Sequence, residues 1–171
     1  PEAEAEAAAQ RWLPGLAEAE RQAVAWQVRR GVNSPLSSGA GRLFDAVSAL
    51  LGVCDTADYE GQAAVELEIA AGDEATAAPY PFAADDGSLD LRPAIRAMLH
   101  DREQAVPVAT IAARFHATLA EAIVQACRVV ARDTGLERVC LSGGTFQNVR
   151  LLEQVVSGLE AAGLQPFWHH Q

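Results

Sequence analysis

Residues 138–148 read Arg138-Val139-Cys140-Leu141-Ser142-Gly143-Gly144-Thr145-Phe146-Gln147-Asn148. A short apolar run comes first, two glycines follow, and a helical pattern begins near Thr145. This order predicts a strand, a glycine turn and the N-terminus of a helix. Such a junction directs unpaired backbone N–H groups and the positive end of a helix dipole toward one point, which suits a phosphate. The glycines let the main chain approach a ligand closely, and Asn148 is expected one turn into the helix, facing the same pocket.

The residues after this junction predict that it belongs to a strand–loop–helix–strand unit over residues 138–168. The expected buried stripe of the helix consists of Val149, Leu152, Val156 and Leu159. Gly163 ends the helix, and an extended run resumes at Phe167-Trp168. A unit of about 30 residues in this order implies two parallel strands with a right-handed crossover. Ligands of such sheets bind beyond the carboxyl ends of the strands, where Ser142 to Gly144 fall.

The rest of the chain predicts mainly helices. Apolar residues recur at steps of three and four over residues 16–30, 41–51, 61–71 and 107–133. The expected core stripe of the last segment consists of Ile111, Phe115, Leu119, Ile123, Cys127 and Val130, backed by alanines that predict packing on two sides. Between residues 79 and 91 the pattern changes, and Asp86-Gly87 predicts a short, exposed β-hairpin.

Composition excludes several classes of function. The chain has 171 residues and a net charge of −10, which opposes binding to nucleic acid or to an anionic membrane surface. All 13 basic residues are arginine, which excludes a P-loop lysine and a Schiff-base lysine within these residues. No apolar run reaches the 18 or so residues that would predict a membrane-spanning helix.

The cysteines and the first residues of the chain suggest where it functions. Cys54, Cys127 and Cys140 are scattered and each lies in an apolar stretch. They predict small buried side chains in a reducing compartment, and hence a cytoplasmic protein. The chain begins with Pro1 and shows no signal pattern, so we expect it to be part of something longer.

Four blocks of sequence, in this order, resemble the HypF family of hydrogenase-maturation carbamoyltransferases. They are Ser37–Val47 (SSGAGRLFDAV), Tyr59–Ala64 (YEGQAA), Phe115–Ala120 (FHATLA) and Leu141–Asn148 (LSGGTFQN). The resemblance implies an α/β fold, namely a partial lobe of the actin/Hsp70/sugar-kinase architecture, rich in helix and with a small mixed sheet. Residues 1–32 would be an N-terminal helical segment, and residues 33–171 an incomplete nucleotide-binding carbamoyltransferase module.

The resemblance also implies an activity and its partners. Carbamoyl-adenylate, formed with ATP, would bind between the lobes of the complete module. The carbamoyl group would pass to the C-terminal cysteine thiol of a HypE-like acceptor protein, on the way to the cyanide ligands of [NiFe] hydrogenase. A divalent metal, zinc or iron, would be held by a His-rich block before residue 1 and by a second block after Gln171, outside this chain.

The family likeness carries over to six positions. Asp45 matches an aspartate that contacts the nucleotide ribose in the related tRNA threonylcarbamoyl-transfer proteins. Gly61 matches a glycine that approaches the nucleotide, and Asn148 an asparagine that contacts it. The loop beside the phosphate would consist of Ser142, Gly143 and Gly144. No residue is assigned as catalytic.

Each of these positions has a plain structural interpretation as well. The glycine bend could be an ordinary turn, Asp45 a solvated helix carboxylate, and Asn148 a helix cap or surface residue. His116 is expected to be a hydrogen-bonded structural histidine, while Arg42 could pair with an anion or with a carboxylate.

Two alternatives remain open for the whole chain. The first is an O-carbamoyltransferase that acts on a small-molecule hydroxyl, and the second is a non-catalytic nucleotide-binding or interaction module.

Overall fold

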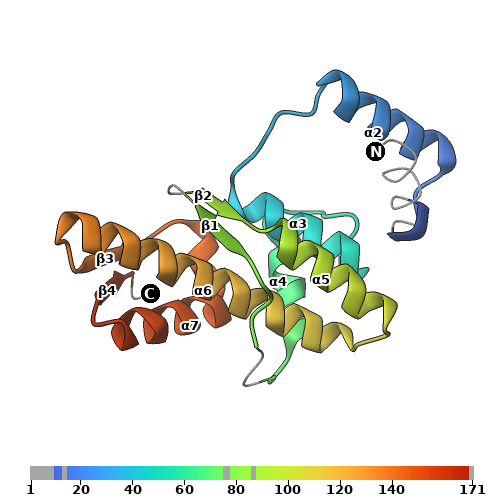
Figure 1. Ribbon diagram of the computed structural model, residues 1–171. Coiled ribbons are helices and arrows are strands. Elements are labelled where there is room, and N and C mark those ends of the chain that lie inside the picture. Colours follow the sequence, from blue (N-terminus) through green and yellow to red (C-terminus); the bar gives the residue numbers. More distant parts are fainter. Residues whose placement is uncertain (1–9, 13–14, 75–77, 86–87, 170–171) are drawn as a thin grey trace. The chain divides into compact units, whose positions relative to one another are not determined.

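The computed structural model describes residues 10–12, 15–74, 78–85 and 88–169 (Figure 1). The chain divides into two compact units, Pro1–Ala64 and Val65–Gln171, and each is described here by itself. The first nine residues of the predicted N-terminal segment and the Asp86-Gly87 turn lie outside the described residues. The functional boundary expected between residues 32 and 33 stays a prediction.

The first unit contains α2 (Glu18–Arg30), α3 (Ala40–Leu51) and the start of α4 (Gln62–Ala71). Gly31 and Gly52 are the C-cap residues of α2 and α3. Their φ angles of 65° and 69° lie in the left-handed region, which commonly ends a helix and favours glycine. No residue of α2 is buried, so the apolar positions predicted there form no core face. In α3 the buried residues are Phe44, Val47, Ser48 and Leu51.

The second unit is organised around α6 (Val108–Thr134), against which α5 (Arg92–Glu103) and α7 (Val149–Ala161) both pack (Figure 1). The first half of α6 is buried on every side, at Ile111, Ala112, Ala113, Phe115, His116, Thr118, Leu119 and Ala120. This confirms the packing on two sides that the alanines predicted. The expected stripe stops short, because Val130 near the end of α6 is 55% exposed. Sequence reasoning missed α5, whose many charged residues mask its two buried positions, Ala94 and Met98.

The buried face of α7 differs from the predicted one. Leu151, Val155 and Leu159 are fully buried, whereas Val149 is 57% exposed. Apolar residues cover a wide arc of this helix, so spacing alone did not fix which part of the arc faces inward. Gly158 lies at the contact with α6, and a Cβ added there would come within 2.7 Å of Val124 Cγ2. This close approach of the two helices selects the face that carries Leu151 and Val155.

Among the residues that the structure describes, the strands form two separate pairs, where a single mixed sheet was expected. β1 (Ala83–Asp85) and β2 (Ser88–Asp90) are antiparallel neighbours, as the predicted hairpin requires. β3 (Arg138–Leu141) and β4 (Gln165–Trp168) are parallel, with Leu141 opposite Trp168. The pairs stay apart because the hairpin strands pair locally, while α7 joins β3 to β4. The predicted strand–loop–helix–strand order over residues 138–168 is confirmed.

The cysteines lie in three different environments. Cys54 is buried and Cys127 half-buried, but Cys140 is exposed, so the prediction of three buried thiols was wrong for Cys140. Exposure alternates along β3, where Arg138 and Cys140 are exposed and Val139 and Leu141 are less so, which places Cys140 on the exposed face of the strand. All three cysteines are free thiols. In the described part of the chain no helix combines the length and the apolar character needed to cross a bilayer.

A buried tyrosine fastens the segment before β1 to α5 and α6. The Tyr80 hydroxyl donates to Asp101 Oδ2 at 2.7 Å, and the Tyr80 N–H donates to Thr118 Oγ1 at 2.7 Å. The Arg114 guanidinium pairs with Asp101 and lies 3.9 Å from the centroid of the Tyr80 ring. Burial, together with the hydrogen bond to Asp101, raises the pKa of Tyr80 far above its usual value. The hydroxyl is therefore a permanent donor at neutral pH.

Replacing Phe115 by Ala should lower the free energy of unfolding by about 3–5 kcal/mol, because the ring is 2% exposed and its removal leaves a cavity. Chemical denaturation measures this loss. Val130→Ala on the same helix is the control and should change stability by about 0.5 kcal/mol or less. A loss below about 1 kcal/mol for Phe115→Ala would show that the ring is not a core residue.

Gly158→Ala should destabilise the chain by about 1–3 kcal/mol, because the new methyl overlaps Val124, whose branched side chain is stiff. The same change in a Val124→Ala background should instead be neutral or stabilising by up to about 1 kcal/mol, since alanine is the better helix former. A double-mutant cycle by denaturation measures both effects. Equal effects of Gly158→Ala in the two backgrounds would contradict the close contact.

Candidate functional site

The predicted glycine bend follows β3 directly. Ser142, Gly143 and Gly144 are exposed, and Gly143 has φ 93°, a conformation that strains any residue with a side chain. A Cβ added to Gly143 or Gly144 would meet no atom within 4 Å. Within the described residues, the backbone N–H groups of these two glycines donate no hydrogen bond. Two adjacent unpaired N–H donors beside open space can bind an anion.

A 3₁₀ helix, Gly144–Gln147, separates this bend from α7. Phe146 N donates to Gly143 O at 3.2 Å, which closes the tight turn. Asn148 is the N-cap of α7, and its Oδ1 accepts from Leu151 N at 2.8 Å. The prediction that Asn148 lies one turn into the helix was therefore wrong. The tight turn uses the residues that spacing assigned to the helix, and an asparagine side chain favours the cap over the helix interior.

The N-terminus of α7 is already capped from within the protein. Besides Asn148, the carboxylate of Glu68 on α4 accepts from Arg150 N at 2.8 Å. In return, the Arg150 guanidinium donates to Gly72 O at 3.0 Å and to Glu74 O at 2.8 Å, beyond the last residue of α4. The two helices thus cap each other. Because a carboxylate occupies the positive end of α7, the anion donors of this site are the bend amides, not the helix dipole that the sequence suggested.

His116 on α6 contacts this junction through the side chain of Asn148. It is fully buried, its Nδ1 lies 2.8 Å from Ala112 O, and its Nε2 lies 3.1 Å from Asn148 Nδ2. Burial, together with the positive charge of Arg150, lowers the pKa of His116 to about 4. The ring is therefore neutral at physiological pH. These contacts identify a hydrogen-bonded structural histidine, as the sequence favoured.

The remaining predicted site residues lie in the first unit. On α3, Arg42 Nη2 lies 2.6 Å from Asp45 Oδ2 in an ion pair one turn apart, which answers the open question of the Arg42 partner. The Asp45 side chain is 33% exposed. Gly61 has φ 85° in the turn before α4, so backbone conformation alone accounts for a glycine there. The structure groups Ser142, Gly143, Gly144 and Asn148 in one segment, and the roles of Asp45 and Gly61 stay predictions.

Sequence reasoning missed two residues that build this site, Glu68 and Arg150. They lie 82 positions apart in the chain, and neither falls in a motif. A glutamate within a helix and an arginine near the start of a helix are usually exposed to solvent, so the sequence pattern does not single out either residue. Only the packing of α4 beside α7 brings them together.

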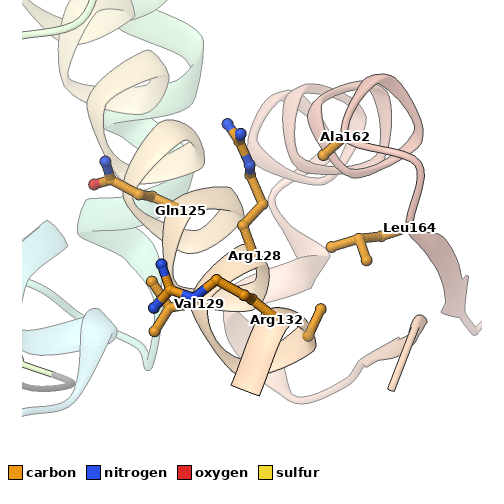
Figure 2. Close-up of a pocket in the computed structure, with 7 residues that line it drawn as sticks. Gln125, Arg128, Val129, Arg132, Ala162 and Leu164 are labelled. Atoms are coloured by element: carbon orange, nitrogen blue, oxygen red, sulfur yellow. The ribbon is translucent and has the colours of Figure 1, made fainter. Parts of the chain in front are cut away.

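A cavity of about 440 Å³ lies elsewhere, between the second half of α6 and the end of α7. Its lining consists of Gln125, Arg128, Val129, Ala131, Arg132, Ala162 and Leu164. Figure 2 shows the Arg128 and Arg132 side chains directed apart, so their charges do not converge on one ligand. The cavity also lies at the C-terminal end of α7, opposite to the glycine bend. It is not the predicted site.

The described residues contain no group of three or more His, Cys, Asp or Glu side chains that could hold a metal ion.

Lowering the pH from 6.5 to 4 should destabilise the native chain more than a His116→Gln variant. The unfolded histidine takes up a proton near pH 6.5, but the buried ring resists protonation until about pH 4. The contribution of the neutral His116 ring to the free energy of unfolding is therefore fully present above pH 6.5. It is lost as the pH falls toward 4, by up to about 1.4 kcal/mol per pH unit. Urea denaturation at several pH values measures the difference between the two proteins. Parallel pH profiles would contradict a neutral buried ring.

Comparison with known proteins agrees with this architecture. A family described as "Carbamoyltransferase, Kae1-like Domain, second subdomain" matches residues 2–171. The carbamoyltransferase HypF homolog of Cupriavidus necator is 41% identical over 158 residues, covering 88% of this chain and 40% of that protein. Carbamoyltransferase HypF of Synechocystis sp. is 36% identical over 148 residues, covering 84% of this chain and 18% of that protein.

A solved structure of full-length HypF in a phosphate- and nucleotide-bound form has the same fold. Its TM-score is 0.85 at 28% identity, and the match covers 95% of this chain and 22% of that one. The chain thus spans less than half the length of the relatives it matches. It belongs to the HypF family of carbamoyltransferases, where it corresponds to the second subdomain of the Kae1-like domain.

Proposed function

We propose that this chain supplies part of the adenylate-binding site of a HypF-type carbamoyltransferase. The observation that carries the proposal is the pair of unpaired N–H groups at Gly143 and Gly144, directly after the carboxyl end of β3. Parallel α/β units bind their ligands at this end of a strand. The relative of known structure with the same fold was solved in a phosphate- and nucleotide-bound form.

The bend amides would bind the phosphate of carbamoyl-adenylate. The absence of side chains at Gly143 and Gly144 leaves room for a phosphate oxygen at hydrogen-bonding distance from the main chain. Ser142, exposed beside them, offers a hydroxyl donor to the same group. Because the phosphate leaves with the electrons of the broken bond, fixed N–H donors would stabilise the charge that grows there.

Asp45 and Gly61 would contact the nucleoside part of the ligand, and Asn148 would also contact the nucleotide. The Asp45 side chain is 33% exposed, and a carboxylate can accept from the hydroxyls of a ribose. Its ion pair with Arg42, one turn earlier on α3, fixes the position of the carboxylate.

In the whole protein, the reaction would transfer the carbamoyl group to a thiol. The sulfur of a C-terminal cysteine of a HypE-like acceptor would attack the carbamoyl carbon, the bond from this carbon to the phosphate oxygen would break, and AMP would leave. The thiol proton would pass to solvent or to a base outside this chain. The product, an S-carbamoyl group, would lead to the cyanide ligands of [NiFe] hydrogenase.

The remaining features of the proposal concern the setting of the reaction. A divalent metal, zinc or iron, would be bound by parts of the whole protein outside this chain. We also propose a cytoplasmic location, which the three free thiols support.

Isothermal titration calorimetry with ATP and with a non-hydrolysable carbamoyl-adenylate analogue tests the proposal. The 171-residue chain should bind with a dissociation constant of about micromolar order, equal to roughly −8 kcal/mol. Asp45→Ala and Gly143→Ala should each weaken binding by roughly 10- to 100-fold, since each removes or blocks hydrogen bonds to a charged group.

Two variants serve as matched controls. Gly135→Ala places a side chain at another positive φ, 71°, in the C-cap of α6, and Asp133→Ala removes an exposed carboxylate from that helix. Both should bind ATP like the native chain. A folded native chain that takes up neither ligand would overturn the nucleotide-binding function and leave the non-catalytic interaction module.

A further inference from the structure

The buried imidazole of His116 is in one tautomer. Ala112 O can only accept a hydrogen bond, so the ring nitrogen 2.8 Å from it, Nδ1, carries the proton. Nε2 then holds a lone pair and accepts from Asn148 Nδ2, 3.1 Å away. Because the ring is 0% exposed, no water competes for either position.

The tautomer of His116 fixes the orientation of the Asn148 carboxamide. With Nδ2 directed to the imidazole, Oδ1 is directed to Leu151 N, where it accepts at 2.8 Å. A flipped amide would set Oδ1 against the lone pair of Nε2 and Nδ2 against the Leu151 N–H. The contacts at both ends of the carboxamide therefore require the same orientation. Nδ2 carries two N–H groups, and only one of them is directed to His116.

Asn148 in turn fixes the glycine bend through the main chain. Its own N–H donates to Thr145 O at 3.4 Å, and its carbonyl accepts from Leu152 N at 3.0 Å. The next bond along the turn runs from Phe146 N to Gly143 O at 3.2 Å. A continuous series of hydrogen bonds thus leads from the interior of α6 to the two unpaired amides.

We propose that His116 is a positioning residue for the anion site: through Asn148 it holds the Gly143 and Gly144 N–H groups in place. This inference rests on the proposed nucleotide-binding function. A neutral, fully buried hydrogen-bond acceptor is needed at this position because Asn148 approaches with a donor. An apolar side chain there would leave that donor unpaired, and the cap and the bend could then shift.

The test compares three variants of the 171-residue chain. His116→Gln keeps an acceptor that can reach Asn148, and His116→Leu removes it. Leu119→Val weakens packing on the same helix without removing a hydrogen-bonding group. NMR reports the hydrogen exchange of the Leu151 amide and the backbone relaxation of Gly143 and Gly144. Calorimetry reports the dissociation constant for ATP.

In His116→Leu we expect the Leu151 amide to exchange roughly tenfold faster, the glycine amides to become more mobile, and ATP binding to weaken roughly tenfold, as for one lost hydrogen bond. His116→Gln should stay within roughly threefold of the native chain in both measurements, and so should Leu119→Val, since neither removes the acceptor. If His116→Leu does not fold, His116→Ser takes its place in the test. The serine side chain is too short to reach Asn148, so this variant should also bind ATP more weakly.

The outcomes separate this inference from the function on which it rests. Native ATP binding that is unchanged in His116→Leu would overturn the positioning role alone. A native chain that does not bind ATP would overturn the nucleotide function. The relaxation of Gly143 and Gly144 would then decide the role of His116, because amides that are unaffected by His116→Leu are not positioned by it.

Discussion

The burial of the first half of α6 is the constraint on which the rest of the second unit depends. Because this half is enclosed on all sides, each polar side chain in it must find a partner within the protein. Thr118 meets this need by accepting from Tyr80 N, and His116 meets it through Ala112 and Asn148. Each pair fastens a segment from another part of the chain to the helix. The polar groups of α6 therefore decide where two loops lie.

One of those loops is the candidate anion site, and its chemistry follows from how α7 begins. A helix N-terminus offers several unpaired amides, and in many proteins a phosphate takes them. Here Asn148 and Glu68 take two of them, and Arg150 returns the contact to the end of α4. The amides that stay unpaired are those of Gly143 and Gly144, one tight turn earlier. The protein thus separates the helix cap, which is structural, from the bend, which can receive a ligand.

Much of this could be predicted from local sequence. Gly31 and Gly52 end helices where the pattern predicted an end, because a left-handed residue favours glycine whatever surrounds it. The strand before Ser142 and the parallel return at Phe167-Trp168 followed from the order of apolar runs and glycines. The buried Phe115 followed from helical spacing in a long segment. In each case neighbours within a few residues carry the information.

Two of the failures share one cause, which is that several arrangements satisfied the same local pattern. The apolar arc of α7 was wide enough for two faces, and contact of Gly158 with Val124 chose one. Asn148 fitted either a helix interior or a cap, and the position of His116 on another helix chose the cap.

The sequence by itself determined most of the helices, the parallel strand pair, the glycine bend and the family resemblance, because each depends on residues close together in the chain. Tertiary structure alone decided which amides of the bend remain unpaired and which side chains hold them. Those answers depend on pairs such as Arg150 with Glu68, brought together only when helices distant in sequence pack side by side.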